Sequence, residues 1–223
     1  MSYILNIETA TTNCSVSLSK KGETVVLKED YNSNYSHAER LHVYIDEVLQ
    51  EAGVSKTQLD AIAVSMGPGS YTGLRIGVST AKGLCFALDK PLIAIQTLKS
   101  LAKQLEVSSG VIIPLLDARR MEVYSAIFDR DYNQIRDTQA QILEPDVFQT
   151  YLEQGHVHFI GNATEKTTEV LEHPNAIFVD GKLPSANEMS ALSFKKYKKS
   201  DIVDVAYFEP YYLKDFIAIK SKK

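Results

Sequence analysis

The sequence has no tryptophan, few cysteines and no long apolar run. Its two cysteines, Cys14 and Cys85, form no Cys-x-x-Cys motif, so neither a disulfide framework nor a zinc ribbon is expected, and both thiols should be buried and reduced. No apolar run is long enough to span a bilayer, and the first residues lack a basic segment followed by a long apolar one. We therefore expect a soluble, cytoplasmic protein that makes no contact with membranes.

An excess of positive charge is also missing. The formal net charge is -4 and the sequence pI is about 5.8, whereas a domain that binds nucleic acid alone usually carries a clearly basic face. Any contact with RNA is thus expected to be shared with a partner. The chain has 223 residues, of which 44% are hydrophobic, which is enough to build two compact lobes.

The first half of the chain alternates strand and helix patterns in a definite order. Strands are predicted over 3–9, 14–20, 23–30, 60–66 and 91–95, and helices over 36–52, over 74–88 and from 97. The first long helix begins at Ser36-His37-Ala38-Glu39, a capping-box pattern. The predicted order is β-β-β-α-β-α-β-α.

The second half repeats this order. Strands are predicted over 110–117, 121–128, 138–143, 157–160 and 176–179, and helices from 144, from the turn at 161–163 to 172, and over 187–199. The repetition predicts a duplicated α/β fold of the actin-like (ASKHA) type, with two lobes around a cleft. We assign 1–104 to the N-terminal lobe, 105–204 to the C-terminal lobe, and 205–223 to a tail that packs back on a lobe.

A glycine-rich turn joins the 60–66 strand to the next helix. Such a turn aims backbone N–H groups at a ligand, as in many phosphate sites, although it also serves simply to reverse the chain. The candidate phosphate loops are Gly67, Gly69 and Ser70, together with Gly161 in the second half, and Glu8 is a candidate metal-organising acid. The segment after Glu8 lacks glycine, so binding of ATP or ADP is expected to be weak or vestigial.

The helix after this turn carries small residues at every fourth position, namely Gly73, Gly77 and Ala81. Glycine inside a helix costs about 0.8 to 1.0 kcal/mol relative to alanine, so something must approach this face closely. Either a neighbouring element of the same lobe packs there, or a partner protein docks there. We expect both, on opposite faces of the helix.

Five segments together resemble the bacterial TsaB family, a glycoprotease-like (YeaZ-type) family of tRNA threonylcarbamoyladenosine biosynthesis, over essentially the full length. They are 7–11, 36–41, 67–77, 117–119 with 122–124, and 210–213. The resemblance implies an actin-like fold and a role in attaching a threonylcarbamoyl group to the adenosine beside the anticodon. It also implies that a larger paralogue, TsaD, does the chemistry and that an ATPase, TsaE, docks on the pair.

The resemblance further implies that this chain is not catalytic. The metal site of the paralogue uses a His-x-x-x-His pair, and this chain has Thr97 and Leu101 at the matching places; neither side chain replaces imidazole as a ligand. We expect no metal site, no required cofactor, pairing with TsaD-like and TsaE-like partners or with itself, and tRNA contact only through the complex. The expected interface residues are His37, Arg40, Tyr44, Gly73, Arg75, Gly77 and Ala81.

Two enzyme classes remain as alternatives. One is an ATP-dependent small-molecule kinase that uses the glycine turns for phosphate and Glu8 or Asp117 as the acid. For Asp117 and the neighbouring Arg119, an ordinary structural ion pair is about equally plausible. The other class is a metallopeptidase, which follows only from the older name of the family. The basic end, 220–223, is expected to be solvated or to lie near tRNA phosphate.

Overall fold

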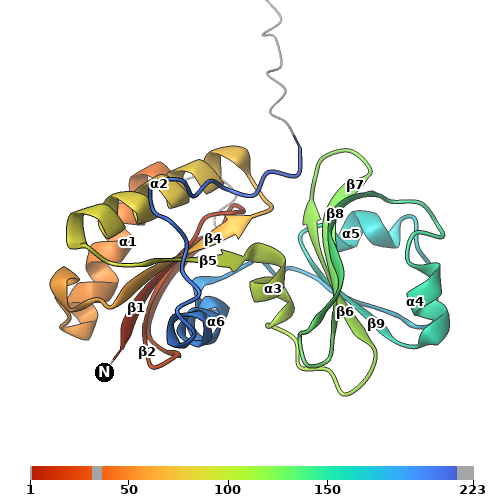
Figure 1. Cartoon of the computed structure of the whole chain (residues 1–223). Helices are drawn as coiled ribbons and strands as arrows, with labels where there is room; N and C mark the ends of the chain where they lie inside the picture. The colour runs from red at the N-terminus through yellow and green to blue at the C-terminus, as the bar shows by residue number, and fades with distance from the viewer. Residues whose placement is uncertain (1, 32–36, 215–223) are drawn as a thin grey trace, which may run out of the picture.

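A computed structural model describes residues 2–31 and 37–214 of the chain, which form two lobes, each built on one five-stranded sheet (Figure 1). The first sheet has the order β3-β2-β1-β4-β5. Its strands are β1 (Tyr3–Glu8), β2 (Cys14–Lys20), β3 (Glu23–Asp30), β4 (Ala61–Gly67) and β5 (Leu92–Gln96). β1 pairs antiparallel with β2 and parallel with β4, so the chain leaves the hairpins and crosses over to build the parallel half.

The second sheet repeats this topology in the order β10-β9-β6-β7-β8. Its strands are β6 (Val111–Asp117), β7 (Glu122–Asp129), β8 (Gln134–Ile142), β9 (Val157–Gly161) and β10 (Ala176–Val179). β6 pairs antiparallel with β7 and parallel with β9, as β1 does with β2 and β4. The duplicated, actin-like fold predicted from the order of elements is confirmed.

Helices cover both faces of the first sheet. α1 (His37–Ala52) and α2 (Tyr71–Leu88) lie on one face, and α6 (Ala186–Lys198) packs on the other, against β1, β2, β3 and β5 (Figure 1). Conversely, α3 (Thr97–Ala102) follows the first sheet in sequence but packs against β6 and β7 of the second. We assigned the helix over 187–199 to the C-terminal lobe, but α6 packs on the sheet of the N-terminal lobe, so the assignment of this helix is corrected. Each lobe therefore contributes one helix to the sheet of the other lobe. The boundary at residue 104 stays a prediction.

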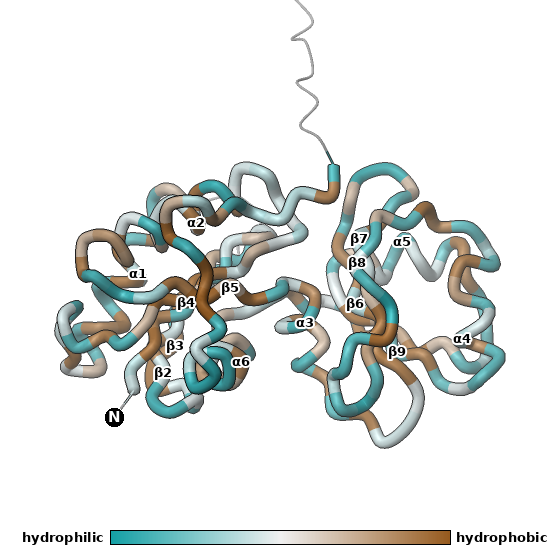
Figure 2. Tube along the Cα trace, in the orientation of Figure 1, coloured by the Kyte–Doolittle hydropathy of each residue, from teal (hydrophilic) through white to brown (hydrophobic). Residues whose placement is uncertain are grey.

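Buried polar residues of β1, β2 and α6 form a polar seam that holds α6 on its sheet, whereas β4 and β5 of the same sheet are apolar (Figure 2). The buried Ser193 hydroxyl donates to Asn6 Oδ1 at 2.6 Å, and Ser17 Oγ donates to the Ala186 carbonyl at 2.8 Å. Asn6 is completely buried. Because buried polar groups are costly when unpaired, these hydrogen bonds fix the position and rotation of α6 more strictly than apolar packing would.

The short elements differ from their predicted bounds. The helix predicted from 144 begins later, as α4 (Gln149–Gln154), and α5 (Thr164–Thr168) is much shorter than the helix predicted to 172. β8 starts four residues before the predicted 138, and a 3-10 turn, η1 (Lys56–Gln58), precedes β4. The Ser36 part of the predicted capping box and the basic end 220–223 lie outside the described residues.

The described part of the tail lies along the first lobe. Val203 forms a backbone bridge with Leu92, and Phe208 packs on the core beneath α2. The Tyr211 N–H then donates to the Met66 carbonyl at 2.7 Å, at the end of β4. Among the helices of residues 2–31 and 37–214, none combines the length and the apolarity needed to cross a bilayer.

Candidate functional site

In the glycine turn between β4 and α2, backbone N–H groups form hydrogen bonds within the protein. The Gly67 N–H donates to Thr97 Oγ1 at 3.1 Å, and the Ser70 N–H donates to the Ala10 carbonyl at 2.7 Å. Ser70 also caps α2, because its hydroxyl accepts from the Gly73 N–H at 3.3 Å. A phosphate at this turn would have to displace these partners, so the geometry does not favour the predicted phosphate loop.

Close neighbours explain why glycine occupies this turn. A Cβ on Gly69 would overlap the Ala10 carbonyl, and one on Gly67, whose φ is +113°, would lie 2.6 Å from the Tyr211 carbonyl oxygen. The tail and the β1–β2 loop therefore occupy the space in which a ligand would approach the backbone. Binding of ATP or ADP here stays a prediction.

The second glycine turn, at Gly161, is packed from two sides. Its φ is +134°, and a Cβ would overlap the Leu115 carbonyl and lie 3.2 Å from Leu101 Cδ2. The neighbouring Asn162 accepts from the Asp117 N–H at 2.9 Å. A hollow of about 510 Å³ opens beside this turn, lined by Gly161, Asn162, Thr164, Glu165, Thr168, Asp180 and Gly181.

α3 connects the two glycine turns. Thr97 and Leu101, the positions that the resemblance matches to metal-ligating histidines, are both completely buried. Thr97 holds the Gly67 turn and Leu101 packs on the Gly161 turn. Within residues 2–31 and 37–214, no three His, Cys, Asp or Glu side chains are grouped so that they can hold a metal ion.

Glu8 is completely buried at the end of β1. Its Oε1 accepts from the Ala10 N–H at 2.6 Å, and Oε2 has no hydrogen-bond partner among the described residues. Burial is the main cause that raises the pKa of this carboxyl to about 7, against smaller opposing effects of its hydrogen bonds. A carboxyl sealed from solvent does not face an open site, so its predicted role toward a metal or nucleotide finds no support here.

Asp117 forms an ion pair with Lys166, which also donates to the Glu122 carbonyl at 2.6 Å. Asp117 thus takes part in a structural ion pair, but with Lys166 rather than with the neighbouring Arg119 that the sequence suggested. In the same hairpin, Arg119 and Arg120 have left-handed backbone, with φ of 70° and 53°. Lys214 of the tail pairs with Glu122, so the tail reaches the second lobe.

The predicted interface residues divide into buried and exposed sets. Gly73, Gly77 and Ala81 lie on the inner face of α2, where a Cβ on either glycine would overlap Thr9. His37 is only 1% exposed; its Nε2 lies 2.7 Å from the Thr11 carbonyl oxygen, and burial lowers its pKa. Packing within the lobe already uses these four positions, so their assignment to a partner interface finds no support in this geometry and stays a prediction.

The rest lie toward the outer surface of α1 and α2, where Arg40 and Arg75 are exposed and Tyr44 is half-buried. Arg40 pairs with the buried Asp30 at 2.9 Å and donates to the Tyr44 hydroxyl at 3.2 Å. The Arg75 guanidinium lies over the Tyr71 ring, 4.1 Å from its centroid. Arg40 and Arg75 are both exposed on the outer surface of their helices.

Sequence reasoning missed two apolar residues on this surface. Phe86 on α2 is 87% exposed and Val43 on α1 is 51% exposed. Both lie off the apolar stripe of their helix, which for α2 runs through Leu74, Val78 and Cys85. Their position outside the apolar stripe is the sequence signal that could have identified them as exposed apolar residues.

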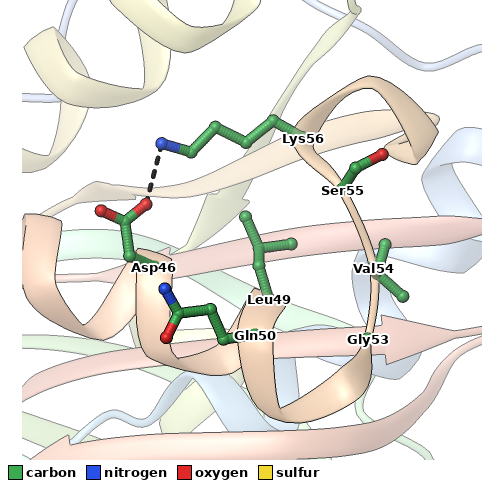
Figure 3. Close-up of a pocket in the computed structure, with 7 residues that line it drawn as sticks. All are labelled: Asp46, Leu49, Gln50, Gly53, Val54, Ser55 and Lys56. Atoms are coloured by element: carbon green, nitrogen blue, oxygen red, sulfur yellow. Dashed lines mark ion pairs between the residues drawn. The ribbon is translucent and has the colours of Figure 1, made fainter.

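A second hollow, of about 360 Å³, lies where α1 ends (Figure 3). Its rim carries the Asp46–Lys56 ion pair, with 2.8 Å between oxygen and nitrogen. Its lining contains no histidine, cysteine or second acid: Asp46, Leu49, Gln50, Gly53, Val54, Ser55 and Lys56. Its one carboxylate, Asp46, is engaged by Lys56, so the lining presents no pair of acids and no histidine beside the Ser55 hydroxyl.

Comparison with known proteins agrees with this geometry. Two lobes with one repeated topology define an actin-like protein, and the ethanolamine utilization protein EutJ from Carboxydothermus hydrogenoformans shares that fold alone, with a TM-score of 0.50, 10% identity, and coverage of 87% of this chain and 90% of that one. The family model described as TsaD, tRNA N6-adenosine threonylcarbamoyltransferase, matches residues 31–220.

Two further matches are nearer. The Escherichia coli (strain K12) protein named tRNA threonylcarbamoyladenosine biosynthesis protein TsaB is 30% identical over 232 residues, which cover 98% of this chain and 97% of that protein. The solved structure of YeaZ from Pseudomonas aeruginosa matches with a TM-score of 0.84 and 27% identity, covering 96% of this chain and 100% of that one. The chain belongs to the TsaB family.

Proposed function

We propose that this chain is a non-catalytic scaffold subunit in the synthesis of threonylcarbamoyladenosine on tRNA, in the cytoplasm. It pairs with a TsaD-like catalytic paralogue, and the pair recruits a TsaE-like ATPase. No cofactor is required by this chain itself. The names of its relatives support the pathway, and the buried Thr97 and Leu101 support the absence of a catalytic metal from α3.

The exposed apolar side chains of α1 and α2 are the observation that carries the pairing. The two helices contact each other on one face of the first sheet (Figure 1). Their small residues face inward, whereas Phe86 and Val43 face outward. A large aromatic side chain that is 87% exposed gains free energy when a partner covers it. In the absence of the paralogue, the same surface is expected to pair two copies of the chain.

Sedimentation of the chain mixed with its TsaD-like paralogue tests the proposal. Phe86→Ser is expected to weaken the complex at least tenfold, whereas the matched change Ile135→Ser, at a 51% exposed position on β8, leaves it intact. Arg75→Glu is a cleaner charge reversal than Arg40→Glu, because Arg40 also neutralises the buried Asp30. Failure of the unmodified chain to form any stable complex contradicts the proposal.

The kinase alternative predicts that the chain binds and hydrolyses ATP, whereas the scaffold proposal predicts that it does neither. Calorimetry with Mg-ATP separates the two functions: micromolar affinity together with hydrolysis favours a kinase, and neither is expected for a scaffold. The engaged donors of the Gly67 turn favour the scaffold.

A further inference from the structure

Six lysines lie on or directly after α3 and the last turns of α6, two helices that contact each other. They are Lys99, Lys103, Lys195, Lys196, Lys198 and Lys199. The two helices contact each other at the junction of the lobes (Figure 1), and the polar seam described above fixes α6 there. The surface formed by these six residues is called the lysine patch below. It stands out in a chain whose formal net charge is -4.

The lysine patch contains little neutralising charge. Lys196 pairs with Asp201 at 3.1 Å, and the ammonium of Lys103 lies 3.9 Å from the centroid of the Tyr132 ring. Within residues 2–31 and 37–214, no carboxylate forms an ion pair with any of the other five lysines. Asp129 offsets part of the charge at Lys99, since it raises the pKa of this lysine, but the two form no ion pair.

The lysines of α3 and α6 are close enough to affect one another. Partial burial lowers the pKa of Lys99, and the nearby ammonium groups of Lys195, Lys103 and Lys196 lower it further. Like charges held together in this way disfavour the folded state. An anion placed across the patch would remove this repulsion.

Helix electrostatics explain only part of the patch. Lysines in the last turn of a helix interact favourably with its negative end, which accounts for Lys195, Lys196 and Lys198 on α6. The negative end of α6 does not explain why α3 places Lys99 and Lys103 next to the lysines of α6. The convergence from two helices requires another explanation.

We propose that the lysine patch binds the phosphate backbone of tRNA when the chain is assembled with its TsaD-like partner. Flexible lysines spread over two helices suit a run of phosphates, each contacted as a point charge, better than one enclosed anion. This inference rests on the proposed function, and it places part of the tRNA contact on this chain.

Titration of an unmodified tRNA transcript into the assembled pair tests the proposal. Lys99→Gln combined with Lys195→Gln is expected to weaken binding about tenfold near 0.1 M salt. The slope of log K against log salt should become shallower by about 1.8, since each lost phosphate contact contributes about 0.9. The matched control is Lys28→Gln with Lys56→Gln, which removes two lysines paired with α1 residues, and less than a twofold change is expected.

Other outcomes decide against the proposal. Equal tRNA affinity and salt slope in the patch variant and the unmodified chain overturn it, as does an equal loss in the control. Binding of anionic phospholipid vesicles with unchanged tRNA affinity would assign the patch to a membrane surface instead. Lys195→Glu with Lys198→Glu, both exposed, gives a second variant if the Lys99 change impairs folding.

The same samples separate this inference from the proposed function. Sedimentation reports pairing, which the patch variants should retain. If the unmodified chain does not pair, the proposed function fails. If the chain pairs but the patch variants bind tRNA as tightly as the unmodified pair does, only this inference fails.

Discussion

Thr97 Oγ1 accepts a hydrogen bond from the Gly67 N–H at 3.1 Å, across the start of α3. One helical turn later, Leu101 packs on Gly161 of the other lobe. The helix that the family resemblance associates with metal binding therefore serves here as a structural link between two glycine turns. Both side chains are buried, Thr97 as a hydrogen-bond acceptor and Leu101 as an apolar contact.

Thr97→Val should destabilise the fold by about 1 to 3 kcal/mol, because it leaves the buried Gly67 N–H without an acceptor at almost constant volume. Urea unfolding followed by circular dichroism measures the change. Thr150→Val, at an exposed position on α4, is the matched control and should shift stability by less than about 0.5 kcal/mol. Equal stability of the Thr97 variant and the unmodified chain would mean that the hydrogen bond does not form in solution.

The glycines of α2 give a second prediction, with opposite signs within one helix. Gly73→Ala should destabilise the fold by about 1 to 3 kcal/mol, because its Cβ would overlap the backbone carbonyl of Thr9. Gly83→Ala should stabilise it by up to about 1 kcal/mol, since Gly83 is exposed and nothing lies within 4 Å of its Cβ position. Thermal or urea unfolding of the two variants measures both effects, and a destabilised Gly83 variant contradicts the argument.

The fold was predictable because its signals are local and repeated. Continuous apolar runs such as 61–64 mark buried strands, and the spacing of Leu41, Ile45 and Val48 marks the helix that covers them. The duplicated order then leaves few possible topologies. The positions of α3 and α6 were not predictable in this way, because an exchange of helices between lobes depends on contacts between distant parts of the chain.

The candidate site was harder to predict for the same reason. The spacing of Gly73 and Gly77 indicates a close approach but not which chain makes it, and only the position of Thr9 decides. Likewise, Glu8 at a strand end suits either an open metal site or a sealed carboxyl. Sequence separates these cases poorly, because burial depends on the β1–β2 loop and on the distant β4.

Glu8 makes stability depend on pH. The ordinary carboxyl pKa of 4.5 applies in the unfolded chain, whereas burial raises the folded value to about 7. Between these values the folded state binds more protons than the unfolded state, so stability falls as pH rises. The contribution is fully present below pH 4.5 and is lost as pH passes through about 7. The total loss is about 3 kcal/mol.

Glu8→Gln should remove this dependence. The stability of the variant relative to the unmodified chain, from urea unfolding, is expected to rise by about 2 to 3 kcal/mol between about pH 5 and pH 8.5. Glu39→Gln, at an exposed position of α1, provides the control and should give a nearly constant difference. A constant difference for the Glu8 variant as well would show that this carboxyl is not sealed from water.

Lys82 fixes the tail on α2, which gives a last prediction. Its ammonium donates to the carbonyls of Ala206 and Phe208, both at 3.0 Å. Lys82→Met keeps the apolar stem but loses two charge-assisted hydrogen bonds, worth about 1 kcal/mol at this partly exposed position. Hydrogen exchange of the Phe208 amide, which bonds to the Asp204 carbonyl at 2.9 Å, should then become about fivefold faster. Lys56→Met, which breaks only the ion pair with Asp46, should leave that amide unchanged, and equal exchange in all three proteins would show that apolar packing alone holds the tail.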